Sequence, residues 1–148
     1  MNHHSNDPVD CYKCEEIFGI YPGFHAGLKA WFQKVHSKFP DAHISCAGRG
    51  RIEQEAAYAR GASQAHWGKS AHNYNMAIDL FRLDETVEGH YSLSRKWFEE
   101  VFAAFPLGDE FYWLGTEGSK FPEIPHVQVM GWADKVMADP DEFPLVEP

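Results

Sequence analysis

Two aromatic-rich amphipathic segments, each followed by a proline, constrain the fold of this chain most strongly. In residues 24–39, apolar side chains recur every three or four positions: Phe24, Leu28, Trp31, Phe32, Val35 and Phe39. Residues 94–105 show the same spacing: Trp97, Phe98, Val101, Phe102 and Phe105. This spacing predicts two α-helices that end at Pro40 and Pro106, because proline lacks the amide hydrogen that a helix interior needs. Each helix must bury its apolar stripe against another element.

Shorter apolar segments have the length of β-strands. Strands are expected over residues 43–47, 76–83, 111–114 and 126–130, and another helix over 52–60 with Gly61 as its C-terminal cap. Alternate residues of a strand face opposite sides, so Ile78 and Leu80 share one face and Asp79 and Phe81 the other. Helices beside a few short strands predict an α+β fold, with a small antiparallel sheet and flanking helices.

Composition indicates one domain in the middle of the chain. The 148 residues are 44% hydrophobic and 15% aromatic, which suffices for one packed core. Residues 1–22 are polar and rich in turn formers, so we expect an N-terminal arm. Residues 133–148 are acidic and hold three prolines, so we expect a proline-rich tail over the surface. The domain is therefore assigned to residues 23–132, and a monomer is expected.

Charge and hydropathy exclude several classes of partner. Lys and Arg number 13 against 22 Asp and Glu, so a general attraction to nucleic acid or to an anionic membrane surface is not expected. No apolar run approaches the roughly 18 residues that span a bilayer. The first residues carry neither the basic nor the apolar region of a secretory signal peptide, so synthesis in the cytoplasm is expected.

Three cysteines are too few for a disulfide scaffold. Cys11 and Cys14 form a single CxxC, and a second pair that would complete a four-thiolate zinc site does not follow. We interpret them as incidental thiols, with half of a metal site or a redox pair as the alternative. Cys46 is interpreted as a small buried hydrophobic residue.

Two of the nine histidines are accompanied by carboxylates at useful spacing. His72 precedes Asp79 by seven residues, so a loop can fold over the predicted strand and bring imidazole and carboxylate together. His126 begins another predicted strand, three residues after Glu123. If the two strands are neighbours, His72, Asp79 and His126 can hold a catalytic zinc, which needs three protein ligands and a position left for water. Glu123 would then lie beside that water and accept its proton.

The sequence around these residues resembles a known family. Ser70-Ala-His72-Asn-Tyr-Asn-Met-Ala-Ile-Asp79 resembles the SxHxxGxAxD signature of the zinc peptidases of family M15. That family includes D-Ala-D-Ala carboxypeptidases, VanX/VanY-type enzymes, L-alanyl-D-glutamate endopeptidases and phage endolysins. Glu123-Ile-Pro-His126 resembles its second motif, and Cys46-Ala-Gly-Arg49-Gly-Arg51-Ile-Glu-Gln54 is similar to its GxRSxxxQ-like turn. The resemblance covers about residues 43–130, with the motifs in the right order.

The resemblance implies a role for each matched residue. Three residues are implied as zinc ligands: His72, Asp79 and His126. Glu123 is implied as the catalytic acid and base. Arg49 is implied as the cation that holds a substrate carbonyl and stabilises the oxyanion. A solvated charge is the alternative for Arg49, and Arg51 is the alternative residue for this role. Ser70 would support the loop or the substrate, with a simple turn cap as its alternative.

Two positions depart from the family pattern. Asn75 stands where the signature has glycine. If this position requires a positive φ, asparagine is the least costly substitute. The acid is Glu123 rather than aspartate, and both occur in different branches of the family.

The resemblance implies a hedgehog/DD-peptidase-like fold and a zinc peptidase that cleaves the peptide stems of bacterial peptidoglycan. The first expectation is an L-alanyl-D-glutamate endopeptidase acting as a phage endolysin, which reaches the wall after a separate protein permeabilises the membrane. A D-Ala-D-Ala carboxypeptidase is the alternative within the family. A non-catalytic, hedgehog-like zinc domain is the alternative outside enzymes. Glu123 favours an enzyme, because a structural zinc site does not need a non-ligand acid beside an open position.

Overall fold

A five-stranded antiparallel sheet forms the centre of the protein, seen in a computed structural model that describes residues 21, 23–116 and 123–147. The strands are β1 (Ala42–Cys46), β2 (Ala77–Leu83), β3 (Tyr91–Ser92), β4 (Phe111–Trp113) and β5 (His126–Val129). Their order is β1–β2–β5–β4, and β3 pairs with the end of β2. β2 therefore lies between β1 and β5, as the predicted site requires.

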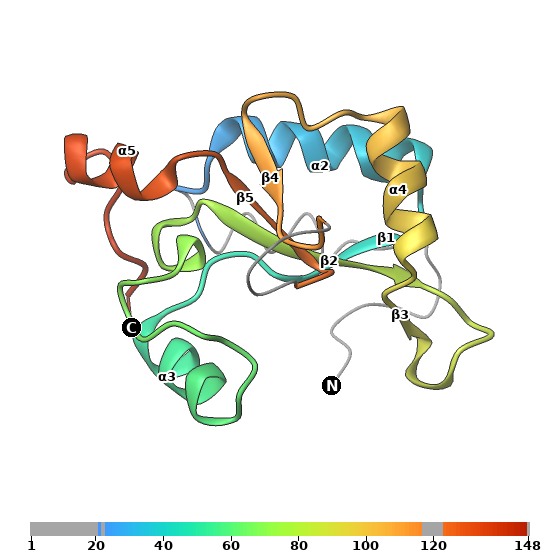
Figure 1. The fold of residues 1–148 in the computed structure, drawn as a ribbon, viewed down its shortest axis with the longest axis horizontal. Helices are drawn as coiled ribbons and strands as arrows, with labels where there is room; N and C mark the ends of the chain where they lie inside the picture. The colour runs from blue at the N-terminus through green and yellow to red at the C-terminus, as the bar shows by residue number, and fades with distance from the viewer. Residues whose placement is uncertain (1–20, 22, 117–122, 148) are drawn as a thin grey trace.

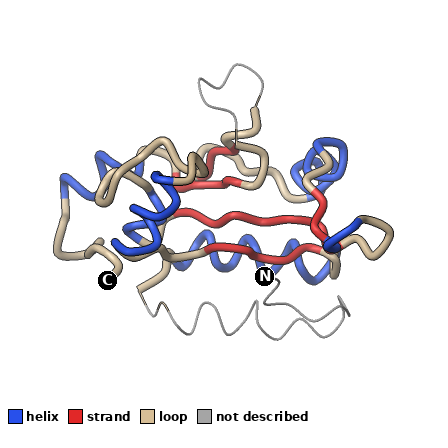
Figure 2. Tube along the Cα trace, turned by 90° about the horizontal axis from the view of Figure 1, so that it is seen from below, coloured by secondary structure: helices blue, strands red, loops and turns tan. Residues whose placement is uncertain are grey.

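Helices lie on both sides of this sheet. They are α2 (Ala26–Lys38), α3 (Arg51–Ala59), α4 (Arg95–Ala104) and α5 (Trp132–Ala138), with 3₁₀ turns η2 (Ala71–Tyr74) and η3 (Glu88–His90). In Figure 1, α2 and α4 lie on one side of the sheet and α3 lies on the other. Figure 2, seen from the α3 side, shows α2 running behind the long strands. The predicted α+β fold with a small antiparallel sheet is confirmed.

The predicted aromatic stripes form the core between the sheet and the two helices α2 and α4. Leu28 and Phe32 of α2 and Phe98 of α4 are at most 2% exposed. The ring of Phe98 stacks on Trp113 of β4 with centroids 5.9 Å apart. Each such side chain contributes roughly 1.5–3 kcal/mol by leaving water. Core packing therefore fixes one face of the sheet and leaves the other for polar groups.

β2 separates these two environments by strand alternation. Ile78 and Leu80 are fully buried in the core. Asp79 points to the opposite face, where Phe81 stacks on Tyr91 with centroids 4.5 Å apart. This division agrees with the predicted alternation.

Periodicity and composition did not predict α5 (Trp132–Ala138). Residues 133–148 were expected as an acidic tail over the surface, but most of α5 lies in this stretch, and Trp132 at its start packs against Tyr74 of η2 with ring centroids 5.6 Å apart. Further on, the amide of Val146 donates to the carbonyl of Asn73 at 2.7 Å. The prolines that suggested a tail follow the helix and do not interrupt it. Cys11 and Cys14 lie outside the described residues.

None of the helices in the described part of the chain is long and apolar enough to cross a membrane.

A matched pair of methionines tests the core. Met76 is fully buried and Met137 is 81% exposed. Met76→Ala should lower the free energy of unfolding by about 2–5 kcal/mol, because it leaves a cavity. Met137→Ala should change it by less than about 0.5 kcal/mol. Urea unfolding of both variants measures the difference, and equal effects would contradict this core.

Candidate metal centre

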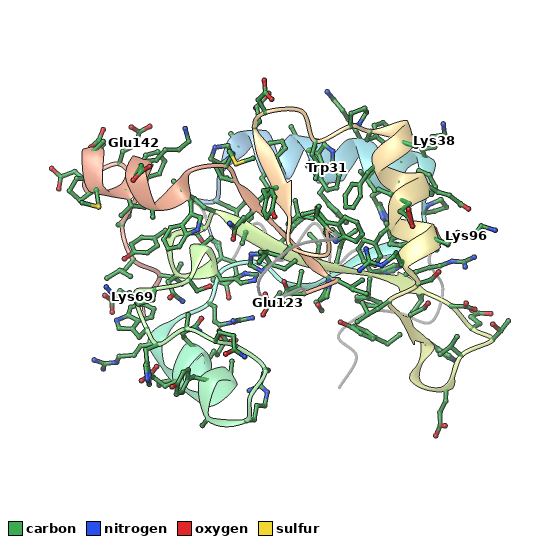
Figure 3. All side chains as sticks on the ribbon, in the orientation of Figure 1. Trp31, Lys38, Lys69, Lys96, Glu123 and Glu142 are labelled. Carbon is green, nitrogen blue, oxygen red and sulfur yellow. The ribbon has the colours of Figure 1, made fainter. Side chains whose placement is uncertain are left out.

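Three neighbouring strands each place one possible metal donor in the same row. Asp79 of β2 pairs with His126 of β5 on one side and with Cys46 of β1 on the other. Side chains of directly paired residues lie on the same face of a sheet. Figure 3 shows the labelled Glu123 on the side of the sheet away from Trp31 of α2. The candidate centre therefore lies on the face that the helices of the core leave open.

The turn η2 brings His72 over this row. Ser70 caps η2, because its hydroxyl accepts a hydrogen bond from the His72 amide at 3.3 Å. Asn75 ends the turn with φ 57° and ψ 34°, in the left-handed region. This position therefore has the positive φ for which asparagine is the least costly substitute for glycine. The cap and the left-handed residue let the chain turn from η2 into β2 within a few residues.

One oxygen of Asp79 faces a nitrogen of each histidine. Oδ1 lies 3.1 Å from His72 Nε2 and 3.3 Å from His126 Nδ1. The two imidazole rings are nearly perpendicular, with centroids 4.8 Å apart. Ligand atoms on one tetrahedral zinc ion, bound at roughly 2.0–2.1 Å, lie about 3.3 Å apart. These spacings fit a shared zinc ion.

The other nitrogen of each ring is held by an oxygen that can only accept a hydrogen bond. His72 Nδ1 is 2.7 Å from the Ala47 carbonyl, and His126 Nε2 is 2.9 Å from Gln128 Oε1. Both of these nitrogens therefore carry the proton. A lone pair on His72 Nε2 or His126 Nδ1 would face the carboxylate oxygen of Asp79 unfavourably, so a proton or a metal cation must lie between each nitrogen and that oxygen. A metal cation can take the place of this proton, and an oxygen partner on the other ring nitrogen is typical of metal-binding histidines.

At His72 and Asp79, neighbouring charges and hydrogen bonds together shift each pKa more than burial does. Burial alone would lower the pKa of His72, but the charge of Asp79 raises that pKa well above its ordinary value. Burial would raise the pKa of Asp79, but His72 and the hydrogen bond from His126 hold that pKa far below its usual range. Asp79 is therefore ionised at neutral pH and available to a cation.

Arg49 holds the second oxygen of Asp79. Its Nη2 lies 3.5 Å from Asp79 Oδ2, and its Nη1 donates to Gln54 Oε1 at 3.2 Å. Burial alone would lower the pKa of Arg49, but the nearby Cys46 and Asp79 raise this pKa by more than burial lowers it. The guanidinium therefore stays charged. The Arg49 side chain is 14% exposed, whereas Arg51 is exposed at the start of α3. Arg49 is the better placed of the two predicted alternatives.

A buried pair of amides ties Arg49 to the surrounding loops. Gln54 and Asn73 are fully buried and hydrogen-bonded to each other at 3.1 Å. Gln54 Nε2 also donates to Ser63 Oγ and to the Ala65 carbonyl. Asn73 Nδ2 donates to the Arg49 carbonyl at 3.0 Å. Asn73 was not predicted, since one amide in a polar loop gives no sequence signal of burial.

A pocket of about 350 Å³ opens above the centre. All six predicted site residues line it: Arg49, Ser70, His72, Asp79, Glu123 and His126. Glu123 Oε2 lies 3.7 Å from His126 Nδ1, and its side chain is 34% exposed. Glu123 is therefore close to His126 yet open to the pocket. Leu93, Ile124 and Pro125 supply apolar walls.

Cys46 was expected as a buried hydrophobic residue, and this interpretation is wrong. It is half-buried, with Sγ 3.7 Å from His72 Nδ1. The order Cys46–His72–Asp79 also matches a nucleophile, a base and an orienting carboxylate. A thiol–imidazole mechanism does not suit it, because the Ala47 carbonyl keeps the proton on Nδ1, and this nitrogen cannot accept the thiol proton.

Comparison with solved structures finds the same fold in an endopeptidase. The crystal structure of Serratia marcescens L-Ala D-Glu endopeptidase ChiX superposes with a TM-score of 0.63. The match covers 84% of this chain and 90% of that chain at 20% sequence identity. The two proteins share a fold. No family model matches this chain, and no curated protein matches it.

The amide pair gives a stability prediction. Gln54→Met keeps the length of the side chain but leaves the Asn73 amide and the Ser63 hydroxyl without their partner. It should lower the free energy of unfolding by about 2–3 kcal/mol. Gln33→Met, at an exposed position of α2, should change it by less than about 0.5 kcal/mol. Chemical unfolding of both variants checks this, and similar small effects would show that the amide pair is not needed.

Proposed function

We propose that the protein is a zinc-dependent peptidase that hydrolyses the peptide stems of bacterial peptidoglycan. The main support is the convergence of two ring nitrogens with fixed tautomers on one oxygen of Asp79, beneath a pocket that also holds a carboxylate and a guanidinium. The shared fold with an L-Ala D-Glu endopeptidase supports the same reading. His72, Asp79 and His126 would hold the zinc, and membership of peptidase family M15 is part of this proposal.

Each pocket residue has a task in such a hydrolysis. Zinc, when bound, acts as a Lewis acid that polarises the scissile carbonyl and makes water more acidic. Glu123 accepts the proton of the attacking water and passes it to the leaving amine. Arg49 would stabilise negative charge on the carbonyl oxygen, and the contacts that hold its guanidinium against Asp79 and Gln54 support this role.

The walls of the pocket suit a short extended peptide. Its apolar side comes from Leu93, Ile124 and Pro125, and hydroxyls come from Ser63 and Ser70. The net charge of −9 argues against long-range attraction to an anionic cell wall. Recognition would therefore depend on contacts within the pocket.

The preferred activity is L-alanyl-D-glutamate endopeptidase, in the role of a phage endolysin made in the host cytoplasm. Incubation of zinc-loaded protein with defined muropeptides, read by mass spectrometry, tests it. Cleavage between L-alanine and D-glutamate is expected. Release of terminal D-alanine would instead indicate the carboxypeptidase, and zinc binding without cleavage would indicate the non-catalytic zinc domain.

Metal content tests the ligand set. The wild-type protein should bind one zinc ion per chain, as measured by elemental analysis after dialysis. His72→Ala removes one of three ligands and should lower the zinc affinity by at least about tenfold. His66→Ala, which changes an exposed histidine paired with Glu55, is the matched control and should keep full affinity. Full zinc occupancy in His72→Ala at limiting zinc would refute this ligand set.

Glu123→Gln tests the catalytic acid and base. Glutamine keeps the volume and an acceptor oxygen but cannot take up a proton near neutral pH. The rate of hydrolysis should fall about 10²–10⁴-fold, while zinc content and melting temperature stay close to wild type. Glu99→Gln, at an exposed position of α4, should leave all three unchanged.

Two results of the Glu123→Gln experiment would contradict its assignment. Retained turnover would move the base to another residue. Loss of zinc would make Glu123 a ligand and would favour a closed, structural centre.

A further inference from the structure

The thiol of Cys46 borders the candidate centre and has no task in the proposed hydrolysis. The donor atoms of Cys46, His72 and Asp79 all lie within 4.8 Å of one another. Cys46 is half-buried, so its side chain lies at the site and is not part of the buried core.

A β-bulge directs Cys46 toward these ligands. Ile44 follows the regular register of β1 and β2, which would continue by setting Cys46 opposite Ile78. The register shifts between Ile44 and Cys46, so Cys46 opposes Asp79 instead. A bulge adds one residue to one strand and changes the direction of the side chains near it, and bulges are frequent next to active sites. The backbone irregularity therefore brings a sulfur donor to the metal row.

We propose that Cys46 is a further ligand of the metal centre, bound as a thiolate together with His72, Asp79 and His126. This inference rests on the proposed function. Zinc binds sulfur at roughly 2.3 Å and nitrogen or oxygen at roughly 2.0–2.2 Å, so two ligands of one ion lie at most about 4.5 Å apart. Sγ lies 3.7 Å from His72 Nδ1 in this structure, so binding to an ion on Nε2 requires the Cys46 side chain to turn toward Asp79. The thiol proton passes to solvent as the sulfur–metal bond forms.

Ligation by Cys46 would change both the charge and the openness of the centre. One carboxylate and one thiolate neutralise a divalent ion, which lowers the cost of holding it in a half-buried site. Four protein ligands are typical of closed zinc sites, whereas catalytic sites leave one position open. The resting enzyme would therefore be held in a closed form of low activity, and loss of the thiolate would open it.

Cobalt absorption tests the sulfur bond directly. The parent protein for this experiment carries Cys11→Ser and Cys14→Ser, so Cys46 is the remaining one of the three cysteines. One equivalent of Co²⁺ should give a thiolate-to-cobalt charge-transfer band in the near ultraviolet. Adding Cys46→Ser should abolish this band and keep the visible cobalt bands, because the nitrogen and oxygen ligands remain. If that variant does not fold, the parent spectrum decides, and a bound cobalt ion without the sulfur band overturns the proposal.

Activity separates this inference from the proposed function. Zinc-loaded parent and Cys46→Ser proteins are compared on the same muropeptides, and Cys46→Ser should cleave them several-fold faster. An equal or lower rate would overturn the closed resting centre. Hydrolysis without a sulfur band would keep the peptidase and overturn Cys46 ligation. A sulfur band without hydrolysis by either protein would keep the ligation and overturn the peptidase, and failure to bind Co²⁺ would overturn both.

Discussion

The carboxylate of Asp79 is the group on which the site depends. One of its oxygens faces two imidazole nitrogens and the other faces the Arg49 guanidinium. A carboxylate in a largely buried place is costly unless it is paired on every side. β5, η2 and the loop after β1 each supply one partner for it. These contacts with Asp79 hold three separate parts of the chain together around β2.

Sequence reasoning could place this cluster because the required information is local. His72 lies seven residues before Asp79, and Glu123 lies three residues before His126. In the structure the two side chains of each pair lie close together. The adjacency of β2 and β5 was an assumption, and their pairing at Asp79 and His126 satisfies it. The α+β class could be predicted because the apolar stripes of the two helices must be buried against another element, and the short strands supply it.

The features that the sequence did not reveal all depend on distant contacts. The bulge in β1 is a property of the pairing between two strands, so the residues 42–46 alone do not show it. The burial of Gln54 and Asn73 depends on the contact between α3 and η2, where the two amides meet. α5 is short and mostly exposed, and its position is fixed by the contact of Trp132 with Tyr74. Periodicity and composition are insensitive to such contacts, because they register only what lies nearby in the chain.

The bulge also shows how a small change in backbone register could decide the chemistry of the centre. With regular pairing, Cys46 would lie opposite Ile78, and the Asp79 row would hold nitrogen and oxygen donors alone. With the bulge, a sulfur donor joins the same row. Oxygen and nitrogen ligands with one free position suit hydrolysis, whereas an added thiolate suits a closed centre with greater affinity for thiophilic ions. If Cys46 binds the metal as proposed, one inserted residue at the end of β1 separates two kinds of metal site on the same fold.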